Sequence, residues 1–125
     1  MAIEGVAKTF LAGAAITKRR IVKLGADDKH VIQGAAATDS LIGVADSLGA
    51  AAAEDPIDVI LQGISDVELG GTVTRGGLLS SDANGKAVAA APGAGTNNRI
   101  IGFALASGVS GDIIAVQISQ GSVQG

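Results

Sequence analysis

The chain has 125 residues and a mass of 12.1 kDa, which is the length of one domain built largely from small side chains, among them 19 glycines. It has no cysteine, which excludes disulfides, thiolate metal sites and a cysteine nucleophile. A net charge of −3 and the absence of tryptophan and tyrosine argue against binding to nucleic acid. The order of the N-terminal residues does not match an export signal, and no apolar run reaches the ~18 residues that cross a membrane, so we expect a soluble, untargeted protein.

An internal duplication is the most informative pattern. Residues 10–18 align with residues 67–75 at an offset of 57, and the glycine, the β-branched residue, the threonine and the basic residue coincide. Residues 41–45 align with residues 100–104 at an offset of 59, after which the offset returns to 57. Order, spacing and residue class agree better than chance similarity explains. The sequence therefore predicts two similar units, about residues 5–61 and 62–118.

Each unit is predicted to read strand, turn, strand, loop, strand, loop, strand, because its apolar runs are short, β-branched and bounded by turn residues. The turn in the second unit contains Asn84-Gly85, a hairpin signal, and Asp27-Asp28 occupies that place in the first. Residues 47–54 favour helix by propensity, but their counterpart, 106–111, is a Gly/Ser loop. We therefore expect loops in both places, with at most one helical turn in the first.

These elements predict an all-β fold, either a compact β-barrel or a two-sheet sandwich, in which the two duplicated units are related by pseudo-twofold symmetry. The expected organisation is an N-terminal arm (1–8), a single β domain (9–118) and a C-terminal tail (119–125). The tail is expected to be disordered, or to form an interface strand if an oligomer orders it. A core of aliphatic side chains with almost no aromatic residues also favours association of subunits.

No combination of residues predicts a catalytic, cofactor or metal site. His30 is the single histidine and is expected to be a surface residue, because the sequence offers it no obvious ligand set or triad. The acidic pairs Asp27-Asp28 and Glu54-Asp55 are expected to be solvated loop acids. The glycine-rich stretches match neither nucleotide-binding fingerprint, and residues 80–85 lack the spacing of a calcium loop. We therefore expect a protein that is not an enzyme and has no cofactor.

Two segments are candidates for contact with a partner protein or another subunit. The first is a basic cluster, which reads either as a solvated strand edge that discourages sheet pairing or as a partner for acidic residues on another protein. The second is the N-terminal arm with the apolar residues that follow it, which can add a strand to a partner's edge or simply fray. The candidate residues are Ile3, Val6, Phe10, Leu11, Lys18, Arg19, Arg20 and Lys23.

A resemblance to a known family rests on two runs of residues, 14–27 with 41–45 and 73–88 with 99–104. Both runs contain a β-branched residue, a threonine, a basic residue, a hairpin and then an apolar-Ile-Gly-apolar-Ala strand. This pattern, over nearly the whole chain, resembles the small capsid decoration, or cement, proteins of tailed bacteriophages. The first unit departs from it at Arg19-Arg20, where the second unit has Gly76-Gly77.

The resemblance implies a structural protein that binds the outer surface of the assembled head, bridges neighbouring major capsid subunits and stabilises the shell. It also implies a homo-oligomer, with a trimer favoured and a dimer possible, that is soluble in the host cytoplasm before assembly. The implied partner is the major capsid protein, with no direct contact with nucleic acid or membrane. Two alternatives remain: a small oligomeric β scaffold or assembly factor in a non-capsid complex and, with less support, a carbohydrate-binding β module, which would normally present Trp or Tyr.

Overall fold

The computed structural model describes residues 6–125, and within them the chain is all-β, as the sequence predicts. It has ten strands where the sequence pattern indicated four in each unit, because β1 and β6 were not foreseen. The strands are β1 Ala7–Ala12, β2 Ile21–Leu24, β3 His30–Gln33, β4 Leu41–Ala45, β5 Pro56–Ile60, β6 Gly63–Glu68, β7 Leu78–Ser81, β8 Ala87–Ala89, β9 Asn97–Ala104 and β10 Ile113–Gln124.

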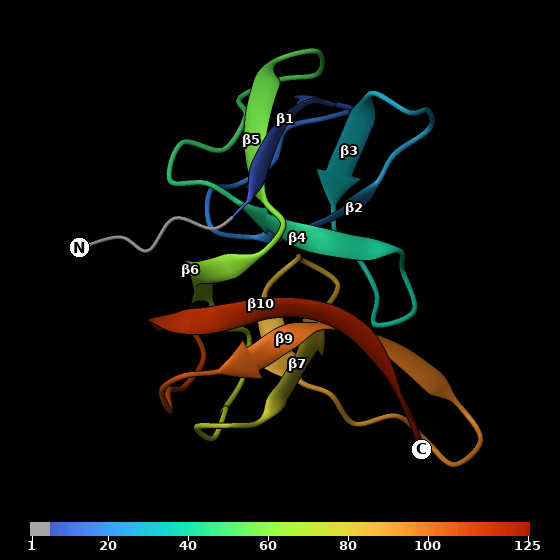
Figure 1. Cartoon of the computed structure of the whole chain (residues 1–125), viewed down its shortest axis with the longest axis vertical. Helices are drawn as coiled ribbons and strands as arrows, with labels where there is room; N and C mark the ends of the chain where they lie inside the picture. Colours follow the sequence, from blue (N-terminus) through green and yellow to red (C-terminus); the bar gives the residue numbers. More distant parts are fainter. Residues whose placement is uncertain (1–5) are drawn as a thin grey trace.

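The strands form two five-stranded sheets, one from each half of the chain, and Figure 1 shows one sheet above the other. The first sheet closes into a barrel in the order β1-β3-β2-β4-β5, because β5 pairs with β1. The second sheet has the order β6-β10-β9-β7-β8 and stays open. Its outer strands meet at one isolated parallel bridge, Leu69↔Ala87, whereas β1 and β3 share two registered pairs in the barrel.

Strands at corresponding positions pair in corresponding ways in the two sheets. Ile21↔Val44 in the barrel matches Leu78↔Phe103 in the second sheet, at the predicted offsets of 57 and 59 residues. Arg19 has a φ of 60°, close to the 88° of its counterpart Gly76, so the same backbone turn forms without a glycine. We call β1–β5 the first unit and β6–β10 the second unit; their origin by duplication stays a prediction.

Two apolar clusters make up the core. One fills the barrel and consists of first-unit residues such as Val22, Val31 and Val59. The other fills the inner side of the second sheet, but it also includes Ile21 and Val44, which project from the outside of the barrel. The barrel therefore supplies side chains that complete the core of the second unit, and the two units share one buried interface.

The predicted Asn-Gly turn is confirmed, and it also joins the units. Gly85 has a φ of 74°, and the Asp82 carboxylate accepts hydrogen bonds from the backbone of Asn84 and Lys86. The carbonyl of Gly85 accepts a 2.7 Å hydrogen bond from the backbone nitrogen of Ile21. The turn therefore connects β7 to β8 and binds the beginning of β2.

A glycine in each unit explains the Ile-Gly motif. A Cβ on Gly43 would collide with the Ile60 carbonyl, and a Cβ on its counterpart Gly102 would collide with the Gln117 carbonyl. Both glycines lie where β4 or β9 crosses close to the backbone of the next strand. The motif is therefore required by backbone packing.

The ends of the chain differ from the expected arm and tail. Strand β1 begins at Ala7, so residues 7 and 8 of the expected arm are already paired with β5. Residues 119–125 do not form a disordered tail, because β10 continues to Gln124 and its last residues pair with β9. A register shift between Ile118 and Gly121 lets β10 leave β6 and follow β9 alone. The loops expected between β4 and β5 and between β9 and β10 are present, without a helix.

Candidate docking surfaces

Most of the basic cluster is used inside the molecule. The Arg20 guanidinium donates a 2.9 Å hydrogen bond to Glu68 on β6 and another, of 2.8 Å, to the Asn84 carbonyl. Arg19 pairs with Asp66 at 3.3 Å, and Lys23 pairs with Asp39 at 3.0 Å. The interpretation of the cluster as a solvated strand edge is therefore wrong for these three residues. Lys18 is exposed and has no carboxylate within 4.0 Å among residues 6–125.

Arg20 and Glu68 form the strongest polar tie between the two units. Both side chains are largely buried, and Glu68 also lies 3.5 Å from the Lys86 ammonium. Burial raises the pKa of Glu68, but the hydrogen bond from Arg20 and the nearby cations outweigh it and hold the pKa below its usual value. The carboxylate is therefore ionised at neutral pH and orients the start of β2 against β6.

The N-terminal candidates lie at the rim of the barrel. Ile3 falls outside the described residues. Val6 is half exposed, and its carbonyl accepts hydrogen bonds from the backbone of Leu61 and Gln62. It lines an open groove of about 450 Å³ beside β4 and Gln120 of β10. Phe10 and Leu11 are half-buried in β1, and the Lys8 ammonium lies 5.1 Å from the Phe10 ring centroid. Of these residues, Val6 is the one that offers an exposed apolar side chain.

His30 has partners that the sequence did not reveal. Its Nδ1 lies 2.7 Å from the Asp27 carboxylate in the β2–β3 turn, and its Nε2 lies 2.8 Å from Glu54 in the β4–β5 loop. The hydrogen bond to Asp27 and then the one to Glu54 raise the pKa of His30, and the bond to His30 lowers the pKa of Asp27. Both ring nitrogens are engaged by carboxylates, so the arrangement is an ionic clasp between two loops.

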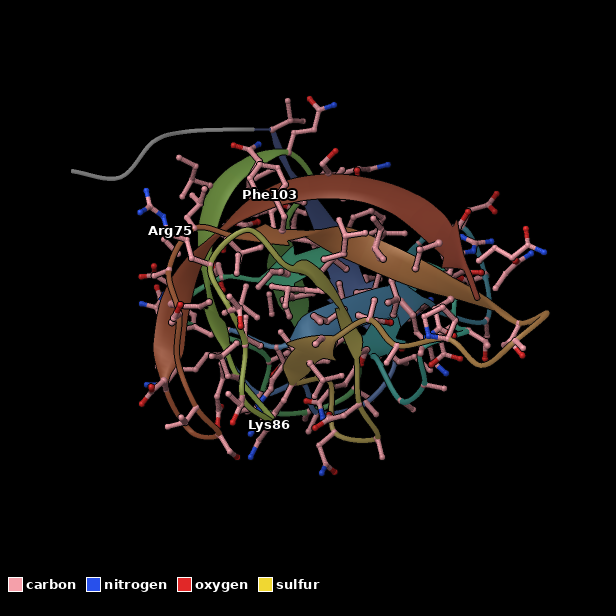
Figure 2. All side chains as sticks on the ribbon, turned by 90° about the horizontal axis from the view of Figure 1, so that it is seen from below. Arg75, Lys86 and Phe103 are labelled. Carbon is pink, nitrogen blue, oxygen red and sulfur yellow. The ribbon has the colours of Figure 1, made fainter. Side chains whose placement is uncertain are left out.

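Exposed apolar side chains gather on the outer side of the second sheet. Phe103, Leu78 and Ile113 are 37%, 41% and 52% exposed, and Phe103 pairs with Leu78 on one side and Gln117 on the other. Arg75 lies beside Phe103 and Lys86 at the opposite edge of the view in Figure 2. No motif in the sequence marked this surface. We call it the outer face: Ile64, Leu78, Phe103, Leu105, Ile113 and Ala115.

The described part of the chain offers little to a catalytic reading. Among residues 6–125, no group of three or more His, Asp and Glu side chains has a geometry that could hold a metal ion. No helix within these residues is long and apolar enough to cross a membrane. The ionisable clusters that are present, at Arg20 and at His30, connect elements of the fold to one another.

The family comparison matches the chain along nearly its full length. A family model described as "Phage cement protein" matches residues 2–118, which include all strands of the first unit and the second unit as far as Ile118 in β10. The chain belongs to the phage cement protein family. As a member of this family it is a structural protein associated with the phage capsid. The resemblance found in the sequence is thereby confirmed.

A solved structure shares the fold of this cement protein. It is described as "head fiber gp8.5 N base in bacteriophage phi29" and superposes with a TM-score of 0.68 at 19% sequence identity. The match covers 91% of this chain and 93% of that chain, so it includes both units. At this identity the likeness shows a common fold. No curated protein matches the chain.

Proposed function

We propose that this cement protein binds the outer surface of the assembled head, bridges neighbouring major capsid subunits and stabilises the shell without catalysing a reaction. The observation that carries the proposal is the family match over residues 2–118, which includes both units. The phi29 protein with the same fold is described as part of a head fiber, which supports a place on the head. The major capsid protein is the proposed partner, and neither nucleic acid nor membrane takes part in binding.

The architecture is suited to a bridging role. The two units share a core in which Ile21 and Val44 of the barrel are completely buried, and Arg20 ties the barrel to β6 and to the β7–β8 turn. Force applied to one unit is therefore transmitted to the other through packed side chains and charged hydrogen bonds. A stiff block of this kind can hold two capsid subunits at a set distance. Contacts that are weak singly add up when they repeat around a closed shell.

The N-terminal segment is part of the proposed contact with the capsid. Val6 is exposed at the groove beside Leu61 and Gln120, so the residues before it start from an apolar rim. A deletion of residues 2–5 removes Ile3 and keeps β1 whole, because β1 begins at Ala7. We expect this deletion to weaken binding to heads while leaving the thermal unfolding of the protein unchanged. Unchanged binding would remove the segment from the mechanism.

Co-sedimentation with expanded heads that lack the protein tests the proposal. We expect saturable binding at a fixed number of copies per head and a rise in the temperature at which the heads release their DNA. Unexpanded heads serve as the matched control for surface specificity. Recovery of the protein only in the supernatant would overturn the proposed function and favour a scaffold in another complex.

A further inference from the structure

The outer faces of the two units have corresponding positions but different surroundings. In the barrel, Ile21, Val44 and Ile60 form one row across three strands, and the row packs into the core of the second unit. In the second unit the same row is Leu78, Phe103 and Gln117, and nothing in residues 6–125 covers its two apolar members. A row that is an interface in one unit is therefore exposed in the other.

Beyond this row, the second unit replaces acids with apolar residues. Asp46 and Asp58 of the first unit correspond to Leu105 and Ala115 of the second, because Ala45↔Val59 matches Ala104↔Val116 in register. Val116 and Ile114 point into the core, so Ala115 and Ile113 point outward by strand alternation. The first unit has a charged exterior where it meets solvent, whereas the second has an apolar one. Such a contiguous apolar surface is typical of a contact with another protein.

Opposite charges lie at the two edges of this face. Asp66 on β6 pairs with Ala115 on β10, Leu105 donates a backbone hydrogen bond to Ala115, and the turn after Arg75 is bonded to Ala104. Asp66 and Arg75 therefore end the same cross-strand row, roughly 14 Å apart at ~4.8 Å per strand. Arg75 has no carboxylate within 4.0 Å in the described part of the chain, and the Asp66 side chain is 52% exposed despite its contact with Arg19.

We propose that the outer face binds the outer face of a second copy of this chain around a twofold axis. In such a pairing the arginine edge of one copy lies over the aspartate edge of the other, so Arg75 meets Asp66 twice, and the apolar rows cover each other. The occupant is a second copy because the face supplies both halves of its own charge complement. An apolar centre with one ion pair at each rim is also the composition of homodimer interfaces. The trimer that the resemblance favours would require two different patches.

The mass of the purified protein in solution tests this pairing without using heads, so its outcome is independent of the proposed function. Light scattering at micromolar concentrations is expected to give twice 12.1 kDa. Phe103→Asp is expected to raise the dimer Kd roughly 30-fold or more, as loss of an interface hot spot does. Leu48→Asp is the matched control, because Leu48 is 84% exposed on a loop of the barrel and lies outside the face.

A charge exchange tests the geometry. Arg75→Asp alone and Asp66→Arg alone are each expected to weaken the dimer about tenfold, and the double exchange is expected to restore it. Circular dichroism and thermal unfolding establish that each variant is folded. A monomeric or trimeric wild-type protein, equal effects of Phe103→Asp and Leu48→Asp, or a double exchange no better than the single ones would overturn the proposal.

Discussion

The first and second units differ in how they bury the same arrangement of strands. The first closes into a barrel with its own core, whereas the second stays open and receives Ile21, Leu41 and Val44 from the barrel as part of its core. The outward side of the first unit is consequently occupied, and that of the second is free. The comparison teaches that similar units in one chain can divide the work, one completing the fold and the other presenting a surface.

The glycine in each Ile-Gly motif allows the largest expected effect to be compared between units. Gly43→Ala and Gly102→Ala each place a Cβ against a strand carbonyl, and Gly102 also has a φ of 150°. Each is expected to lower the free energy of unfolding by roughly 3 kcal/mol. Urea denaturation measures it, with Gly121→Ala as the control because its Cβ would make ordinary contacts at 3.5 Å. Equal stability of all three variants would contradict the packing argument.

The tie between the units is tested by Arg20→Ala. This change removes two charged hydrogen bonds and leaves Glu68 with Lys86 alone, so we expect a loss of about 2 kcal/mol. Arg19→Ala breaks a more exposed pair and is expected to cost less than ~1 kcal/mol. Chemical denaturation of both variants measures the difference. A larger effect for Arg19 would show that the tie does not hold the units together.

The His30 clasp exists in one unit, because the corresponding residue of the second unit is Ala87. Bonding to Asp27 and Glu54 raises the pKa of His30 above 6.5, so its contribution to stability is complete below pH 6.5 and is lost as the pH rises through the raised value. The stability difference between wild type and His30→Ala is therefore expected to shrink from pH 6 upward. Urea titrations across this range measure it, and a difference independent of pH would contradict the clasp.

The smallest expected effect is a gain. Ser80 is buried, and its hydroxyl has no hydrogen-bond partner among the described residues, whereas the hydroxyl of neighbouring Ser81 donates to the Asp82 carbonyl. Ser80→Ala is expected to raise the free energy of unfolding by about 1 kcal/mol, and Ser81→Ala to lower it. Thermal unfolding of the two variants compares them directly. Destabilisation by both would indicate that the Ser80 hydroxyl is satisfied in solution.

Local signals in the sequence predicted those features that depend on a few neighbouring residues. The Asn84-Gly85 turn, the loops before β5 and before β10, and the burial of Ile57, Val59, Ile114 and Val116 are all confirmed. The partners of the basic cluster were not predicted, because Arg20 and Glu68 are 48 residues apart and the spacing within a strand does not encode such a contact. The carboxylates around His30 were missed for the same reason. Position-by-position comparison of the units, Asp46 with Leu105 and Asp58 with Ala115, is the signal that could have found the outer face.

The amino-acid sequence by itself determined the all-β class, the paired units and the resemblance to cement proteins, since these follow from short apolar runs, turn residues and a repeated order. Tertiary structure alone decided that the first sheet closes, that the C-terminal residues extend β10, and which apolar row stays exposed. The physical reason is that side-chain alternation fixes which residues share a face of a strand. Whether that face is covered depends on segments distant in the chain, brought together by the folded core.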